Sequence, residues 1–225
     1  GWQTGNDPDH YQYRRVAAED PAVDMNARLQ DRELLESVSD FTLELPHPQV
    51  TDFKPAMRNW GTDWQAVSAG YLPAGDILVA AEKRCDTSAQ HLLRTFARHK
   101  QRLRWEQTYR KQDGLVSEAM LAAYGFAEII GLCGPFVSDR IRAGIAIWGA
   151  HLDYPQHQHQ AEEIYIVLAG SAEFSFDNHR AQTRRAGDVV FVESNRRHGF
   201  HTTDESLVIF YLWQAGDLRQ TSSFT

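Results

Sequence analysis

The sequence predicts a mainly β protein in which a largely helical N-terminal part precedes an all-β barrel or sandwich. The period of the apolar residues leads to this fold class. As far as Pro135 they recur at the spacing of helices, and after it they alternate with polar residues as strands do. The later segments are also short and bounded by Gly, Asp or Asn, which is typical of antiparallel sheets. We therefore expect a helical extension over residues 1–134, packed on a β domain over residues 135–225.

Three helices are expected in the N-terminal part, after an extended polar arm that runs to about Asp24 and packs on a partner or on the barrel. The first, Asn26–Ser39, has leucines at roughly helical spacing and ends before two prolines. The second, Ser88–Arg110, has an apolar side opposite many Arg and Lys residues. The third, Ser117–Ile130, is mostly apolar and ends near a glycine. We expect these helices to shape or cover the mouth of the barrel.

Five strands are expected after Pro135. In Arg140–Trp148 the odd positions are apolar, as in a strand with one buried face. The others are rich in Val, Ile, Phe or Tyr and span Glu163–Leu168, Ala172–Phe176, Asp188–Val192 and Leu207–Leu212. Short strands at this spacing predict an antiparallel sandwich or barrel.

Composition excludes several classes of partner. The net charge of −7 and the pI near 5.8 argue against nucleic-acid binding, which needs a basic surface. No apolar run is long enough to span a bilayer and no signal-peptide pattern opens the chain, so no membrane association is expected. Cys85 and Cys133 are isolated in the sequence, which predicts two buried structural thiols and a cytoplasmic protein.

A cluster of metal-binding residue types stands in the last third of the chain. Alternate strand residues share a face, so His157 and His159 project together, and Glu163 has the same parity. A fourth ligand must come from another strand, and His198 is the best candidate because it follows Asp188–Val192 across a short loop. Histidine and carboxylate ligands suit one divalent transition metal per chain, either Fe(II), Zn, Mn, Ni or Co. Histidines two residues apart are by themselves commonly surface residues, so the prediction depends on the whole set.

The set resembles the two metal-binding motifs of the cupins. The first motif is HxH, three residues, Glu, six residues and Gly, and here it comprises His157, His159, Glu163 and Gly170. The second runs from Gly to Pro, Gly and His, and its positions here hold Gly187, Glu193, Asn195 and His198. Its spacing is intact, although Glu and Asn replace the Pro and the second Gly. The resemblance implies a cupin double-stranded β-helix barrel.

Finer details resemble the cupin dimethylsulfoniopropionate lyases of the DddL or DddQ kind. The similar segments are Tyr154–Tyr165, Gly134–Arg140 and Tyr211–Trp213. This resemblance implies a carbon–sulfur lyase that forms acrylate and dimethyl sulfide by β-elimination, with a metal that binds the substrate carboxylate as a Lewis acid. It implies a small sulfonium carboxylate as substrate. Because cupins often form dimers, a homodimer is also expected.

Two tyrosines are candidates for the base that removes the proton. Tyr165 lies two residues after Glu163 and so projects onto the same face, and the resemblance places the catalytic tyrosine at this position. A free tyrosine has a pKa of about 10, and a nearby divalent cation favours its phenolate. Tyr154 precedes the HxH loop and is a second candidate, either as base or as a residue that orients the substrate. The alternative for both is a barrel-core aromatic.

Further residues are candidates for substrate binding. Trp148, Tyr211 and Trp213 can form an aromatic wall against a sulfonium by cation–π attraction, or they are ordinary packing. His201 lies near His198 and is a candidate contact for the substrate carboxylate, or it is a loop histidine at the barrel mouth. Two other functional classes stay open at this point: a cupin dioxygenase with the same four ligands, and a non-catalytic cupin that binds a small molecule.

Overall fold

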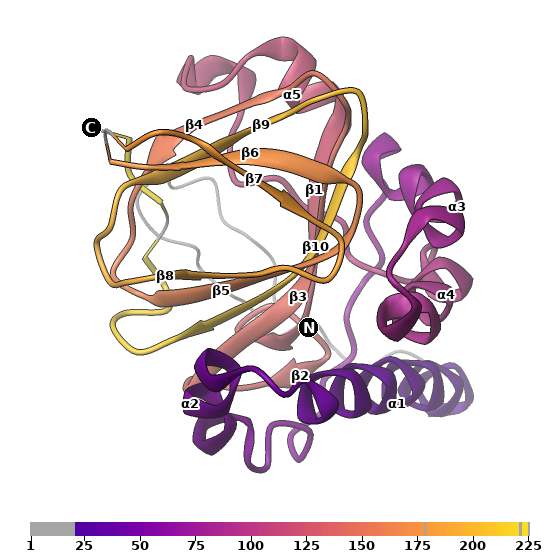
Figure 1. The fold of residues 1–225 in the computed structure, drawn as a ribbon. Coiled ribbons are helices and arrows are strands. Elements are labelled where there is room, and N and C mark those ends of the chain that lie inside the picture. The colour runs from indigo at the N-terminus through magenta and orange to yellow at the C-terminus, as the bar shows by residue number, and fades with distance from the viewer. Residues whose placement is uncertain (1–20, 178, 221, 225) are drawn as a thin grey trace.

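The computed structural model describes residues 21–177, 179–220 and 222–224. The polar arm expected up to about Asp24 therefore lies outside the described residues, except for its last four, which begin the first helix. The helices come first in the chain and the strands follow, as Figure 1 shows. The α-helices of the described residues are α1 (Pro21–Glu44), α2 (Pro48–Met57), α3 (Ile77–Ala81), α4 (Gln90–His99) and α5 (Glu118–Ala123).

The strands form two sheets that curve into one barrel (Figure 1). The six-stranded sheet contains, in spatial order, β2 (Phe136–Val137), β1 (Tyr124–Gly131), β3 (Ile141–Trp148), β10 (Leu207–Gln214), β5 (Glu162–Ala169) and β8 (Val189–Val192). The four-stranded sheet contains β4 (Asp153–His157), β9 (His198–Thr202), β6 (Ser171–Phe176) and β7 (Gln182–Arg185). The five predicted strands are confirmed to within two residues at each end. The predicted fold class, a cupin barrel after a largely helical N-terminal part, is confirmed as well.

The second predicted helix, Ser88–Arg110, is wrong beyond its first half. Helix α4 ends at His99, and the chain then turns towards the sheet. The indole of Trp105 donates to the carbonyl oxygen of Lys100 at 3.0 Å, which satisfies an acceptor just past the helix end. Glu106 then exchanges two backbone hydrogen bonds with Phe126 of β1, at 2.9 and 3.0 Å. The predicted helix misses this pairing because it joins segments far apart in the sequence.

The third predicted helix, Ser117–Ile130, is also wrong over most of its length. Only α5 is helical, and the residues from Tyr124 onward form β1, between β2 and β3 in the sheet. Aromatic and β-branched residues such as Phe126 and Ile129 favour a strand. Nearly all of β1 is buried, so its two faces show no alternation of polarity from which a strand could be recognised. The division expected at residues 134 and 135 stays a prediction, and the six-stranded sheet takes in a strand from before it.

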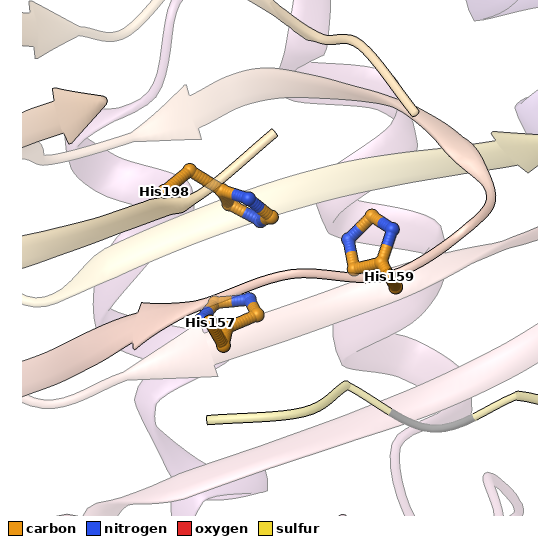
Figure 2. A group of neighbouring side chains, drawn as sticks. All are labelled: His157, His159 and His198. Atoms are coloured by element: carbon orange, nitrogen blue, oxygen red, sulfur yellow. The ribbon is translucent and has the colours of Figure 1, made fainter. Parts of the chain in front are cut away.

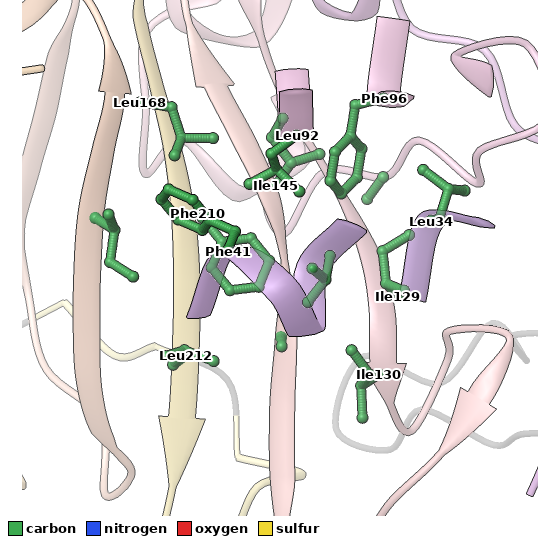
Figure 3. Packing of buried hydrophobic residues seen from close by; sticks show 14 of the residues in the cluster. Leu34, Phe41, Leu92, Phe96, Ile129, Ile130, Ile145, Leu168, Phe210 and Leu212 are labelled. Carbon is green, nitrogen blue, oxygen red and sulfur yellow. The ribbon is translucent and has the colours of Figure 1, made fainter. Parts of the chain in front are cut away.

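Both faces of the six-stranded sheet are buried. On its outer face, side chains such as Ile145 and Phe210 pack against Leu92 and Phe96 of α4 and Phe41 of α1 (Figure 3). Each such side chain contributes about 1.5–3 kcal/mol when fully buried. The expectation that Arg140–Trp148 has only one buried face is therefore wrong, because the even positions, such as Ala146 and Trp148, are also buried, in the interior of the barrel. Helices α1 and α4 cover the outside of this sheet (Figure 1). The expectation that the N-terminal part shapes or covers the barrel mouth stays a prediction.

A second cluster of buried residues fills the space between the two sheets. It is made of alternate side chains from both sheets, among them Tyr165 and Ile209 on one side and Phe174 and Phe200 on the other. Within the described part of the chain, no helix combines the length and the apolar character needed to cross a membrane. Cys133 is buried as predicted, whereas Cys85 is only half-buried.

Candidate functional site

Three histidines meet inside the barrel where β4 ends and β9 begins. His157 and His198 are cross-strand partners, and His159 follows in the loop that leads to β5. Figure 2 shows the three rings grouped together. One ligand atom from each lies within 4.8 Å of the other two, and all three residues are buried.

One kind of hydrogen bond fixes each of these rings. In every case Nδ1 donates to a backbone carbonyl oxygen two residues away at 2.9 Å, and the acceptors are Pro155, Ala161 and Arg196. A carbonyl oxygen can only accept, so the proton of the neutral ring resides on Nδ1 and the lone pair on Nε2. This tautomer, held by a backbone carbonyl, is the one that metal-binding histidines adopt in proteins.

Glu163 completes the group from the start of β5. Its side chain is 3% exposed, and its Oε2 lies 2.9 Å from Nε2 of His159 and 3.5 Å from Nε2 of His198. Since Nδ1 of His159 already donates, a neutral ring presents an acceptor to the carboxylate. Two acceptors at this distance need a proton or a cation between them. The donor set of three imidazoles and one carboxylate therefore fits a divalent metal. All four ligands predicted from the sequence are brought together.

The electrostatics favour the ligand forms of these groups. Burial alone would raise the pKa of Glu163, but the hydrogen bonds and positive charge that His159 and His198 offer when protonated outweigh it and lower the pKa below its usual range. Burial, helped by neighbouring His198, lowers the pKa of His157 well below its usual value. An ionised carboxylate and a neutral imidazole are the states that bind metal ions.

Tyr165 lies beside the ligands as its spacing predicts. Its hydroxyl is 3.3 Å from Nε2 of His198. Burial raises the pKa of Tyr165 well above 10, and the carboxylate of Glu163 raises it further. A cation among the ligands would oppose both effects, because it favours the phenolate.

Tyr154 also lies at the site, in a different environment. Its ring centroid is 4.3 Å from that of His157. Its hydroxyl is 2.9 Å from the hydroxyl of Tyr109, and burial together with Tyr109 raises the pKa of Tyr154. The two candidate bases therefore have different hydrogen-bond partners, a histidine for Tyr165 and a phenol for Tyr154.

A cavity of about 110 Å³ opens beside the ligands. One water needs roughly 10–15 Å³ of such space, so the cavity has room for several waters or for one small organic acid. Its walls include the three aromatic residues predicted to bind substrate, Trp148, Tyr211 and Trp213. Nε1 of Trp148 and the hydroxyl of Tyr211 are buried and have no hydrogen-bond partner among the described residues. Both polar atoms are therefore available to a bound molecule.

Among the predicted site residues, His201 is the one that lies away from both the ligand cluster and the cavity. It lies on β9 three residues after His198, so it projects from the opposite face of the strand. Its side chain is 44% exposed, and Nδ1 contacts Oδ1 of Asp153 at 2.7 Å. A contact between His201 and a substrate in the cavity is therefore excluded by the direction of the side chain.

Several residues of the site were missed by the sequence reasoning. Tyr109 lies in the segment taken for a helix, and Tyr124 belongs to the unrecognised strand β1. Arg142 lines the cavity, with Nε 2.5 Å from Oε2 of Glu128 and its guanidinium 5.5 Å from the ring of Trp213. Arg142 could have been recognised from the sequence. It occupies an even position in a strand whose odd positions are all apolar, so it lies on the face opposite the apolar one.

Known proteins show the same architecture and partly the same sequence. The family model of dimethylsulfoniopropionate lyases matches residues 66–209. The dimethylsulfoniopropionate lyase DddQ of Ruegeria pomeroyi is 37% identical over 121 residues, which are 54% of this chain and 59% of that protein. The putative dimethylsulfoniopropionate lyase DddL of Cereibacter sphaeroides is 30% identical over 134 residues, which are 59% of this chain and 54% of that protein. The aligned regions span less than two-thirds of either relative.

The crystal structure of DddQ from Ruegeria pomeroyi superposes on most of the chain. The TM-score is 0.75 at 28% identity, and the superposition covers 87% of this chain and 97% of that one. The similarity therefore extends beyond the barrel strands into the N-terminal part of the chain.

Proposed function

Because this chain belongs to the dimethylsulfoniopropionate lyase family, we propose that it is a metal-dependent carbon–sulfur lyase that cleaves dimethylsulfoniopropionate to acrylate and dimethyl sulfide. The observation that carries the proposal is the convergence of Glu163, Tyr165 and the three histidines beside one cavity. A carboxylate substrate and a proton acceptor can meet at such a place. The small size of the cavity agrees with a substrate of about eight non-hydrogen atoms.

His157, His159, Glu163 and His198 would hold one divalent ion. When bound, such an ion supplies a Lewis acid for the substrate carboxylate and stabilises the negative charge that develops next to it. The mixed nitrogen and oxygen donors accept Fe(II), Mn, Zn, Ni or Co. Glu163 contributes the single negative charge of the set, and its low pKa keeps that charge in place.

Tyr165 is the proposed base. In the elimination its oxygen, as the phenolate, takes the proton from the carbon next to the carboxylate, and the electron pair of that C–H bond forms the new C=C bond. The C–S bond breaks and its electron pair stays on sulfur, so dimethyl sulfide leaves as a neutral molecule and needs no general acid. Water later takes the proton from Tyr165. The 3.3 Å contact between Tyr165 and His198 supports this role, since it places the hydroxyl at the edge of the ligand set.

The other cavity residues would orient the substrate. The faces of Trp148, Tyr211 and Trp213 can attract the sulfonium by cation–π interaction, which contributes about 0.5–2 kcal/mol for an aromatic ring. Tyr154 stands against His157 and is proposed to orient the substrate, or to act as base in place of Tyr165. The exposed position of His201 leaves it without a part in binding.

Headspace gas analysis tests the reaction itself. Dimethyl sulfide should form when the metal-loaded protein receives dimethylsulfoniopropionate, and its rate should be the same with and without oxygen because the elimination consumes none. Failure to release dimethyl sulfide with each of the five metals would end the lyase proposal. Consumption of oxygen with an organic acid would instead support the cupin dioxygenase.

Replacement of the two tyrosines tests the base. Tyr165→Phe keeps the ring and removes the ionisable oxygen, so metal content should survive while turnover falls at least roughly a hundredfold, as for loss of a positioned base. The turnover rate of the wild type should rise with pH as the phenol ionises, and this rise should be absent in Tyr165→Phe. If Tyr154→Phe is inactive and Tyr165→Phe is not, Tyr154 is the base.

A further inference from the structure

The C-terminal strap, which we define as residues 217–220 and 222–224, lies against the loop that carries two of the metal ligands. Gln158, between His157 and His159, forms an antiparallel bridge with Ser223 of the strap. Gln158 N donates to the carbonyl oxygen of Ser223 at 3.0 Å, and Ser223 N donates to that of Gln158 at 2.9 Å. In Figure 2 the strap is the yellow trace that runs below His157 and His159.

A second pair of contacts holds Gln160 of the same loop, two residues after Gln158. The backbone N–H of Gln160 donates to the side-chain oxygen Oε1 of Gln220 at 2.9 Å. In return, the side-chain oxygen of Gln160 accepts from the backbone N–H of Asp217 at 3.3 Å. The strap therefore satisfies polar groups on both sides of His159. The loop is also held from β8–β9, where Asn195 N donates to the carbonyl oxygen of His159 at 2.8 Å.

The strap also forms part of the cavity wall. The ring of Phe224 lies 5.0 Å from that of Tyr109 and 6.0 Å from that of His157. Gln220 and other strap residues line the cavity on the side next to Arg142. Arg142 in turn donates to the carbonyl oxygen of Leu218 at 3.0 Å, which ties the strap to the barrel wall.

We propose that the C-terminal strap positions the metal ligands and closes the substrate cavity, with Gln220 and Ser223 fixing the ligand loop and Phe224 covering His157. The inference rests on the metal site of the proposed function, and its first part does not depend on the identity of the substrate. Groups that orient ligands from outside the coordination shell typically contribute 10–100-fold to metal affinity. The strap residues contact the ligand loop without supplying a ligand, so they belong to this class.

Zinc affinity of matched variants tests the positioning role. Gln220→Leu removes the oxygen that accepts from Gln160, whereas Gln220→Glu keeps an oxygen there. Ser223→Pro removes the backbone donor to Gln158, whereas Ser223→Ala keeps it. Competition of the 225-residue chain with a chromogenic chelator for Zn²⁺ should give a dissociation constant about tenfold higher for Gln220→Leu and Ser223→Pro. The two matched controls should stay within about twofold of the wild type.

Three outcomes decide this part. Equal zinc affinity in all five proteins would overturn the positioning role. An equal loss in the variants and their matched controls would also overturn it, because the specific hydrogen bonds would then be irrelevant. Thermal unfolding of the metal-free proteins distinguishes a general loss of stability from a local effect on the ligand loop. If Gln220→Leu unfolds at the wild-type temperature and still loses zinc, the effect is on the ligand loop.

Kinetics of Phe224 variants test the closing role. Phe224→Ala should raise KM for dimethylsulfoniopropionate severalfold with a smaller change in kcat. Phe224→Leu should restore most of the lost affinity, because it again covers His157 with an apolar side chain. An unchanged KM in Phe224→Ala would overturn the closing role of Phe224. If the wild type releases no dimethyl sulfide, the proposed function fails, while the zinc measurements still decide whether the strap positions the ligands.

Discussion

The central strands of the six-stranded sheet build two different regions with alternate side chains. On β10, Phe210 joins the outer apolar layer under the helices, and its neighbour Tyr211 faces the cavity. On β5, Ile164 and Ile166 pack outward while Tyr165 between them lies beside the metal ligands. The outer region consists of apolar side chains, and the inner region holds the histidines, the carboxylate and the phenols of the site.

The two regions place different demands on the sequence. An apolar layer tolerates different apolar side chains as long as they fill the same volume, since the hydrophobic effect has no direction. A buried polar group must instead find its partner, because leaving one unpaired costs about 1–3 kcal/mol. The inner region meets this demand with specific pairs such as His157 with the carbonyl oxygen of Pro155. Substitutions in the outer region should therefore change stability, and those in the inner region should change chemistry.

The largest effect should follow loss of a ligand. His198→Ala removes one of the four donors and should cut the metal content of the purified protein to near background, with loss of activity. His201→Ala is the matched control because it lies on the same strand and faces away from the cavity. Metal content per chain, measured by atomic emission, distinguishes them. Full metal occupancy in His198→Ala would remove this residue from the ligand set. The two faces of β9 would then not differ in metal binding.

A smaller effect, of a different kind, should come from neighbouring residues on β10. Phe210→Ala opens a void in the outer layer and should lower the free energy of unfolding by about 3–5 kcal/mol. Tyr211→Phe removes a hydroxyl that has no partner among the described residues, so the same quantity should stay unchanged or rise by up to about 1 kcal/mol. Urea titration measures both. Equal destabilisation by the two substitutions would show that both faces of β10 contribute alike to the free energy of unfolding.

The metal ligands could be predicted from the sequence because their geometry is local. His157, His159, Glu163 and Tyr165 all lie within nine residues, and strand parity predicts a common side for them, although His159 itself lies in the loop between β4 and β5. Only His198 lies far from the others in the sequence, and the spacing of the second cupin motif identified it. The same parity could have excluded His201, since three residues along a strand reverse the face.

The remainder of the site depends on contacts between segments that are far apart in the chain. Tyr109 reaches Tyr154 only because Glu106 pairs with β1, and Phe224 reaches His157 only because the strap bridges to the ligand loop. No spacing within the sequence reports such pairings. The strand β1 was missed for a related reason, because helices bury its outer face and erase the alternation of polarity.

The smallest expected effect is a difference between the inner and outer regions in how the free energy of unfolding depends on pH. Burial raises the pKa of Glu106 at the cavity wall, the charge of Arg104 opposes this, and the net shift is upward. The folded state therefore binds more protons than the unfolded state above the ordinary pKa of the carboxyl group, and stability from Glu106 is lost as pH rises through the raised pKa. Glu106→Gln removes this titration. Relative to the wild type, its free energy of unfolding should improve by less than about 1 kcal/mol between pH 4 and pH 7, since the 2.7 Å ion pair with Arg104 is lost as well.

The loss caused by Phe210→Ala in the outer region should be the same at both pH values, because no titratable group is removed there. Urea titrations at the two pH values measure this difference. A Glu106→Gln effect that does not change with pH would mean that burial of this carboxyl group leaves its ionisation unaffected.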